Sequence, residues 1–184
     1  MNLSAIPNAI CVLRMVMIVP LVVALFAGRY DWALALIVTA GLSDGLDGFL
    51  AKTFGWRSRL GSLLDPAADK LLLVSTFVSL TRLGLVPAGL TAIVILRDIV
   101  IVGGLLAYQR ISHRLEGKPT LISKFNTACQ LLFLVATIVH AQWAQPAVAW
   151  LTLLGAAVVF TSISSGLNYV LVWSRRVRMR TDAA

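Results

Sequence analysis

Long apolar runs separated by short polar segments fill most of this chain. Each run is close to the roughly 20 mostly apolar residues that a helix needs to cross a bilayer. The runs are Ile6–Ala27, Trp32–Ala51, Gly61–Thr81, Val86–Gln109, Leu121–His140 and Ala147–Trp173. Any one of them could be a buried core helix, but six in succession leave too little chain for a soluble domain. The pattern predicts an all-α integral membrane protein with six transmembrane helices in a single domain, residues 1–184.

Basic residues concentrate in the segments that alternate helices would place on one side of the membrane. Ten lie in Lys52–Leu60, in Arg110–Thr120 and after Trp173, whereas the opposite side has only Arg29 and Arg82. This positive-inside bias predicts cytoplasmic termini. It also explains much of the formal net charge of +8 without a nucleic-acid partner. We expect a multi-pass protein of a bacterial inner membrane, whose first run is a retained span and not a cleaved signal peptide.

Acidic residues are scarce, and their positions single out one part of the chain. Only eight of the 184 residues are Asp or Glu. Three fall in loops or the tail, and the others fall in or at the ends of apolar runs: Asp44, Asp47, Asp65, Asp69 and Asp98. An ionisable group at membrane depth costs several kcal/mol and is a functional-site hypothesis by default.

Four of these acids form two closely spaced pairs. Asp44 and Asp47 are three residues apart, and Asp65 and Asp69 are four apart, so each pair shares one helix face. The two runs are antiparallel neighbours, which places both pairs at similar depth near the cytoplasmic surface. Four converging carboxylates repel one another unless cations are bound. Two Mg²⁺ or Mn²⁺ ions match them in charge and in ligand preference.

Two other interpretations of the acids remain open from the residues alone. They could pair with nearby bases such as Lys52, Lys70 and Arg97, or they could line a proton or cation pathway. A transport pathway predicts acids spread along the membrane depth, whereas these cluster near one face. Small residues beside them, including Gly48 and Gly61, leave room for a ligand and favour a substrate site.

The acids belong to a longer pattern with fixed spacing. It reads Asp44-x2-Asp47-Gly48-x2-Ala51-Lys52-x8-Gly61-x3-Asp65-x3-Asp69. This pattern resembles the signature of the CDP-alcohol phosphotransferases, integral membrane enzymes of phospholipid synthesis. The one departure is Lys52, where the family has arginine, which keeps the charge but loses the planar fork.

The resemblance implies a fold, a reaction and roles for individual residues. It implies the six-helix CDP-alcohol phosphotransferase fold, a homodimer, and transfer of a phosphatidyl group from a CDP-linked lipid to an alcohol with release of CMP. The implied metal ligands are Asp44, Asp47, Asp65 and Asp69, with Asp69 also as general base. The implied contacts to the CDP-lipid are Gly48, Ala51, Lys52, Gly61 and Ser62.

Further segments are similar to one subfamily. Residues 58–70, residues 118–127 and Arg97-Asp98 resemble mitochondrial-type cardiolipin synthases, which implies phosphatidylglycerol as the acceptor of CDP-diacylglycerol's phosphatidyl group. The opening Ile6-Pro7-Asn8 with Arg14 also occurs in the phosphatidylglycerophosphate synthases. That alternative implies glycerol 3-phosphate as the acceptor, and an inactive family member acting as a scaffold is a third.

Three bases deep in the apolar runs are candidates for an anionic acceptor. Arg14, Arg97 and Lys124 each lie within about two or three turns of a cytoplasmic helix end and are predicted to bind the acceptor phosphate. Snorkelling to lipid head groups is the alternative for Arg14 and Lys124. Arg97 and Asp98 are adjacent, point in different directions on a helix, and are therefore not expected to pair.

Overall fold

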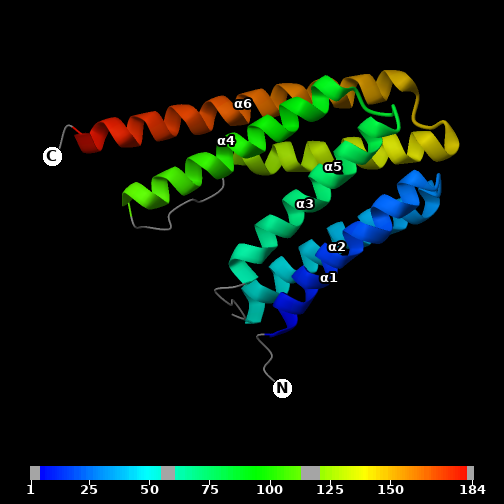
Figure 1. Ribbon diagram of the computed structural model, residues 1–184, viewed down its shortest axis with the longest axis horizontal. Helices are drawn as coiled ribbons and strands as arrows, with labels where there is room; N and C mark the ends of the chain where they lie inside the picture. The colour runs from blue at the N-terminus through cyan, green and yellow to red at the C-terminus, as the bar shows by residue number, and fades with distance from the viewer. Residues whose placement is uncertain (1–4, 55–60, 113–120, 182–184) are drawn as a thin grey trace. The chain divides into compact units, whose positions relative to one another are not determined.

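In the part of the chain that it describes, the computed structural model contains six α-helices, which Figure 1 shows in chain order. It describes the backbone of residues 5–54, 61–112 and 121–181, and the side chains of residues 11–43, 67–104 and 122–169. The helices are α1 (Ala5–Phe26), α2 (Tyr30–Phe54), α3 (Gly61–Arg82), α4 (Ala88–Ser112), α5 (Leu121–Trp143) and α6 (Val148–Thr181). Those backbone ranges hold no strand. The predicted all-α class with one helix per apolar run is confirmed.

Glycine-based turns end two of the helices. Gly28 has φ of 68°, and the amide of Arg29 donates to the carbonyl of Ala24 at 2.9 Å. This left-handed glycine satisfies carbonyls at the end of α1 and reverses the chain. Gly84 has φ of 74° and follows α3 in the same way. The α1 turn is so tight that α2 begins at Tyr30, two residues before the predicted run.

The chain groups into two compact units, of which the first comprises residues 1–86 and 134–148. In this unit α1 packs against both α2 and α3, and the three helices lie side by side in Figure 1. The core contains fully buried apolar side chains from all three: Leu21, Leu25, Ile37, Phe77 and Leu80. Because α1 holds both neighbours, it brings the two acid-bearing helices into one bundle.

The second unit comprises residues 87–133 and 149–184. It contains α4, the first part of α5, and α6. A Cβ atom at Gly155 of α6 would lie 3.3 Å from Leu90 Cδ1 and 3.4 Å from Phe133 Cε2. The missing side chain therefore lets α6 pack closely on α4 and α5. Besides apolar residues, this unit buries several polar side chains, most of which take part in the contacts described below.

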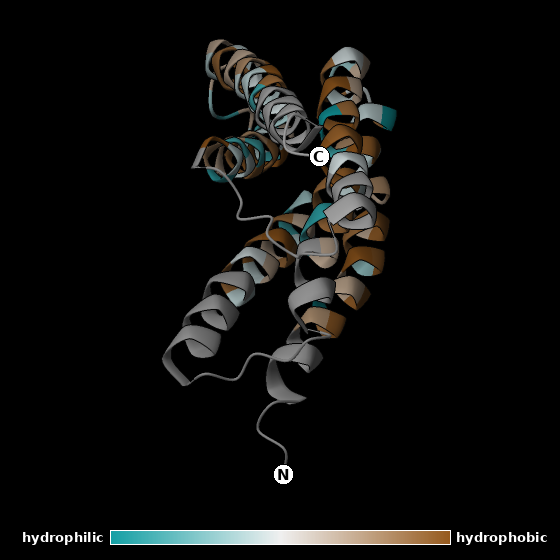
Figure 2. Ribbon diagram, turned by 90° about the vertical axis from the view of Figure 1, so that its left-hand side faces the viewer, coloured by the Kyte–Doolittle hydropathy of each residue, from teal (hydrophilic) through white to brown (hydrophobic). Residues whose placement is uncertain are grey.

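Many large apolar side chains lie on the outside of these helices. Figure 2 shows hydrophobic residues along helices of both units. The exposed ones include Val12, Val16, Val19 and Val23 on α1, and Leu153, Phe160 and Leu167 on α6. Two described segments are long and apolar enough to cross a membrane, Ile122–Trp143 and Val148–Tyr169, while Cys11–Phe26 and Tyr30–Ser43 are shorter apolar segments.

Candidate active site

The acid signature begins on α2 and ends on α3. Asp44 and Asp47 lie in α2, and Asp65 and Asp69 lie in α3, so each pair stands on a helical backbone as the spacing argument requires. The predicted CDP-lipid residues occupy the same two helices: Gly48, Ala51, Lys52, Gly61 and Ser62. Apart from Asp69, the side chains of all these residues lie outside the described ones.

Asp69 is the signature acid whose surroundings the structure describes. It lies on the third turn of α3, where Arg14 of α1 approaches it. Arg14 Nη1 donates to Asp69 Oδ1 in a direct ion pair. The Arg14 side chain is 1% exposed, whereas that of Asp69 is 36% exposed. The guanidinium is thus sealed between helices, and the carboxylate that it holds stays half-open.

The fourth helix carries another ion pair, which is buried on both sides and corrects a prediction. Arg97 Nη1 donates to Asp98 Oδ1 at 2.6 Å, although adjacent residues were expected to diverge and not to pair. The long stem of Arg97 lets its guanidinium turn back to its neighbour. Burial provides the driving force, because the two side chains are only 6% and 11% exposed and opposite charges attract strongly where water is excluded.

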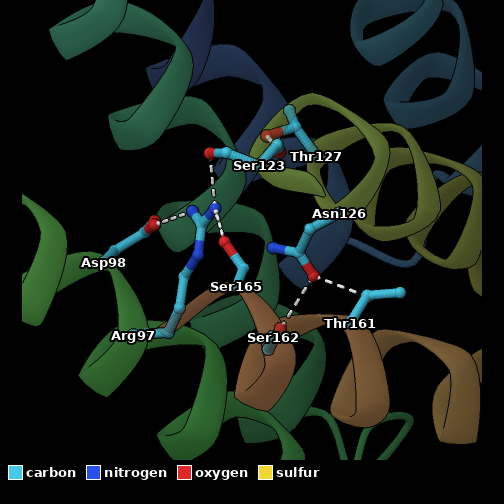
Figure 3. A network of polar contacts seen from close by, with 8 residues as sticks. All are labelled: Arg97, Asp98, Ser123, Asn126, Thr127, Thr161, Ser162 and Ser165. Carbon is cyan, nitrogen blue, oxygen red and sulfur yellow. Dashed lines mark hydrogen bonds and ion pairs between the residues drawn. The ribbon is translucent and has the colours of Figure 1, made fainter. Parts of the chain in front are cut away.

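Arg97 also ties its helix to two others. Its Nη2 donates to Ser123 Oγ of α5 at 2.6 Å and to Ser165 Oγ of α6 at 2.9 Å. Figure 3 shows the guanidinium between Asp98 and the two hydroxyl groups. The Arg97 stem passes Gly166, where an added Cβ would lie 3.9 Å from its Cγ. One side chain therefore joins all three helices of the second unit.

A further polar contact between α5 and α6 lies beside this one and was not predicted. The hydroxyl groups of Thr161 and Ser162 lie 2.7 and 2.9 Å from Asn126 Oδ1. All three residues are buried. The signal was present in the sequence, since Thr161, Ser162 and Ser165 recur at helical spacing within an apolar run.

The three predicted phosphate-binding bases have different surroundings. Arg14 belongs to the first unit and contacts Asp69, whereas Arg97 and Lys124 belong to the second. Lys124 is exposed on α5. Both arginines are buried and already bind carboxylates. Lys124 is therefore the exposed one of the three predicted phosphate-binding bases.

The donor chemistry of the signature fits divalent cations. Its four predicted ligands are all carboxylates, the oxygen donors that Mg²⁺ and Mn²⁺ prefer, and two helices of one bundle carry them. Among the described side chains there is no group of three or more His, Cys, Asp or Glu residues that could hold a metal ion, because Asp69 is the one described member of the set.

Comparison with known proteins places the chain in a family. The model of the CDP-alcohol phosphatidyltransferase family matches residues 4–163. Human cardiolipin synthase (CMP-forming) is 32% identical over 199 residues, which cover 98% of this chain and 65% of the human protein. The rat protein of that name is 32% identical over 186 residues, or 91% and 61% of the two chains.

A relative named for a different activity is about equally similar. Rice chloroplastic CDP-diacylglycerol–glycerol-3-phosphate 3-phosphatidyltransferase 1 is 33% identical over 167 residues, which cover 80% of this chain and 50% of the rice protein. The chain thus spans between 50% and 65% of the length of these relatives. The extent of the family match shows that the chain belongs to the CDP-alcohol phosphatidyltransferase family.

Proposed function

We propose that this chain is a cardiolipin synthase, which transfers the phosphatidyl group of CDP-diacylglycerol to phosphatidylglycerol and releases CMP. The observation that carries the proposal is the complete acid signature, which starts on α2 and ends on α3 at the half-open carboxylate of Asp69. The human and rat cardiolipin synthases support the choice of acceptor, because their similarity extends over 98% and 91% of this chain.

The proposed metal ligands are the four aspartates, Asp44, Asp47, Asp65 and Asp69. Two Mg²⁺ or Mn²⁺ ions held there would neutralise the pyrophosphate of the CDP-lipid and make CMP a better leaving group. The carboxylates would fix the ions at one end of the bundle formed by α1, α2 and α3. Proton transfer and the contacts to the substrates would be provided by side chains of the protein.

Asp69 is the proposed general base. Its carboxylate would accept the proton of the free primary hydroxyl of phosphatidylglycerol. The hydroxyl oxygen would then bond to the phosphorus nearer the diacylglycerol, while the bond from that phosphorus to CMP breaks. The 36% exposure of the Asp69 side chain supports this role, because a base must reach the group that it deprotonates.

Small residues of the signature are the proposed CDP-lipid contacts. Gly48, Ala51 and Gly61 would leave room for the cytidine, and Ser62 would add a hydroxyl group. Lys52 would place a positive charge near a phosphate, as a point charge and not as a bidentate fork.

The acceptor phosphate is proposed to bind to basic side chains near the cytoplasmic helix ends. Lys124 is the strongest of the three candidates, because it is exposed. Arg97 could contribute only N–H groups that are not already bonded to Asp98, Ser123 and Ser165. Arg14 is buried beside Asp69, and its role is considered separately below.

We further propose that all six helices span a membrane, with the termini and the active site on the cytoplasmic side and with homodimers as the working unit. The exposed apolar faces of α1 and α6 support burial in lipid, because soluble monomers rarely expose large apolar patches. Exposed tryptophans flank two turns on the opposite side, Trp32 after α1 and the pair Trp143 and Trp150 around the α5–α6 turn. Such residues typically lie at the bilayer interface.

A second candidate function is phosphatidylglycerophosphate synthesis, with glycerol 3-phosphate as the acceptor. The rice relative supports it, since the activity in its name uses that acceptor and its identity of 33% is close to the 32% of the human protein. The chemistry at Asp69 would be the same. The two candidates differ only in whether the acceptor arrives from the lipid or from water.

The deciding experiment supplies the purified full chain with CDP-diacylglycerol and one acceptor at a time, with Mg²⁺ or Mn²⁺. We expect CMP and cardiolipin from phosphatidylglycerol, no cardiolipin after EDTA treatment, and none from the D69N variant. Product from glycerol 3-phosphate alone would select the second candidate. Absence of CMP with both acceptors and both metals would refute the proposed transferase activity and favour a function in ion transport.

A further inference from the structure

The contact between Arg14 and Asp69 joins helices that are far apart in sequence. Arg14 lies in the middle of α1, and α1 packs along α3. The guanidinium binds one carboxylate oxygen of Asp69. A charge buried in an apolar environment is costly unless it is paired. Breaking the contact between Arg14 and Asp69 would therefore be unfavourable.

The two partners differ in exposure, so the buried Arg14 holds the more exposed Asp69 in place. The Arg14 side chain is 1% exposed and cannot move away without losing its packing, while the Asp69 side chain is 36% exposed. Arginine holds a carboxylate with a rigid, planar set of donors. The pair therefore fixes how the carboxylate is turned and leaves part of it accessible.

The same burial argues against a direct role for Arg14 in phosphate binding. A phosphate on a large head group needs donors at a surface, and the Arg14 guanidinium is enclosed by the first unit. Lys124 has the opposite character, because it is exposed and lies on α5. The two bases, which sequence position alone puts in one class, thus differ in what they can reach.

We propose that Arg14 is a positioning residue, which orients the Asp69 carboxylate toward the acceptor hydroxyl and does not itself bind the acceptor phosphate. The proposal rests on the proposed function, in which Asp69 takes the proton of that hydroxyl. Misplacing a reacting group by about 1 Å typically costs on the order of 10²-fold in rate. Loss of Arg14 should therefore appear in kcat.

The test compares R14Q and R14K with R82Q, a matched control that removes an exposed arginine of the same unit. Steady-state assays of the full chain give kcat and KM for CDP-diacylglycerol and for the acceptor. We expect R14Q to lower kcat about 10²-fold with the acceptor KM nearly unchanged, R14K to recover part of kcat, and R82Q to resemble the wild type.

Each other outcome overturns the proposal in a recognisable way. A large rise in acceptor KM with normal kcat would make Arg14 a phosphate ligand. A normal kcat in R14Q with a lower melting temperature would make it a purely structural contact. A wild-type chain that is inactive with both acceptors would refute the proposed function and the Arg14 role together, whereas an active wild type with a normal R14Q refutes the role alone.

A second measurement is independent of activity. Melting temperatures of R14Q, D69N and the double variant R14Q/D69N form a cycle that reports the contact itself. We expect the double variant to lose less than the sum of the single losses, because either single change already removes the contact between Arg14 and Asp69. Strict additivity would show that the two side chains do not interact, and would refute the positioning role.

Discussion

Replacing Arg97 by methionine tests the polar contact that joins α4, α5 and α6. The substitution keeps a long flexible stem but removes the guanidinium, which donates to Asp98, Ser123 and Ser165. Asp98 would remain in a site where its side chain is only 11% exposed. The variant therefore loses a charge partner where water cannot replace it.

The expected magnitude follows from the buried pair. Breaking a buried ion pair by removing one partner costs about 3–5 kcal/mol. A hydrogen bond to a charged group contributes about 1.5–3 kcal/mol, but these contributions overlap with that of the ion pair and are not added to it. We expect R97M to lower the free energy of unfolding by about 3–5 kcal/mol, and R97M/D98L, which removes both charges, to lower it much less.

The assay is reversible unfolding of the detergent-solubilised chain by SDS, followed by helical circular dichroism. R82M serves as the control, because Arg82 is exposed in the last turn of α3 and surface changes usually stay within about 0.5 kcal/mol. If R97M unfolds like R82M, the contacts of Arg97 do not hold the three helices together. If R97M/D98L is as unstable as R97M, the loss of the charge partner of Asp98 is not what destabilises R97M.

Four other substitutions give separate expectations. G155L should lower the free energy of unfolding by about 1–3 kcal/mol through overpacking, since even a Cβ there meets Leu90 at 3.3 Å; a larger side chain with no loss of stability would refute the close contact. G28A should cost about 1–2 kcal/mol, because alanine is strained at φ of 68°, and an unchanged SDS midpoint would contradict it. D69N should abolish turnover and retain part of CDP-diacylglycerol binding in an equilibrium binding assay; normal turnover removes Asp69 from the mechanism. K124Q should raise the acceptor KM with little change in kcat, and an unchanged KM would exclude Lys124 from phosphate binding.

The helices were predictable because their signal is local. The run Gly61–Thr81 matches α3 to within one residue at its end, since an apolar segment flanked by loop residues needs no knowledge of the rest of the fold. The acid pairs were likewise expected within helices, and α2 and α3 carry them. The two-residue error at the start of α2 came from Gly28, whose left-handed conformation makes the turn shorter than the polar segment between the runs indicates.

The contacts between helices were not predictable by the same reasoning. Arg97 and Asp98 were expected to diverge because Cβ directions differ by about 100° per residue, yet a long side chain reaches further than its Cβ direction suggests. Asn126 and Thr161 are 35 residues apart, and their pairing depends on how α5 and α6 pack. One sequence carries no direct signal for that packing, only the polar residues at helical spacing.

The two buried arginines show how the same pair of charges can have different consequences. Arg97 and Asp98 are both nearly sealed, at 6% and 11% exposure, so their pair has little surface to offer a substrate, and the other bonds of Arg97 join α4 to α5 and α6. Arg14 is equally sealed, but its partner Asp69 is 36% exposed. A closed pair can only stabilise, whereas a half-open pair holds a carboxylate still and also presents it. Exposure, more than the presence of an acid at membrane depth, therefore separates Asp69 as a candidate catalytic group from Asp98 as a structural one.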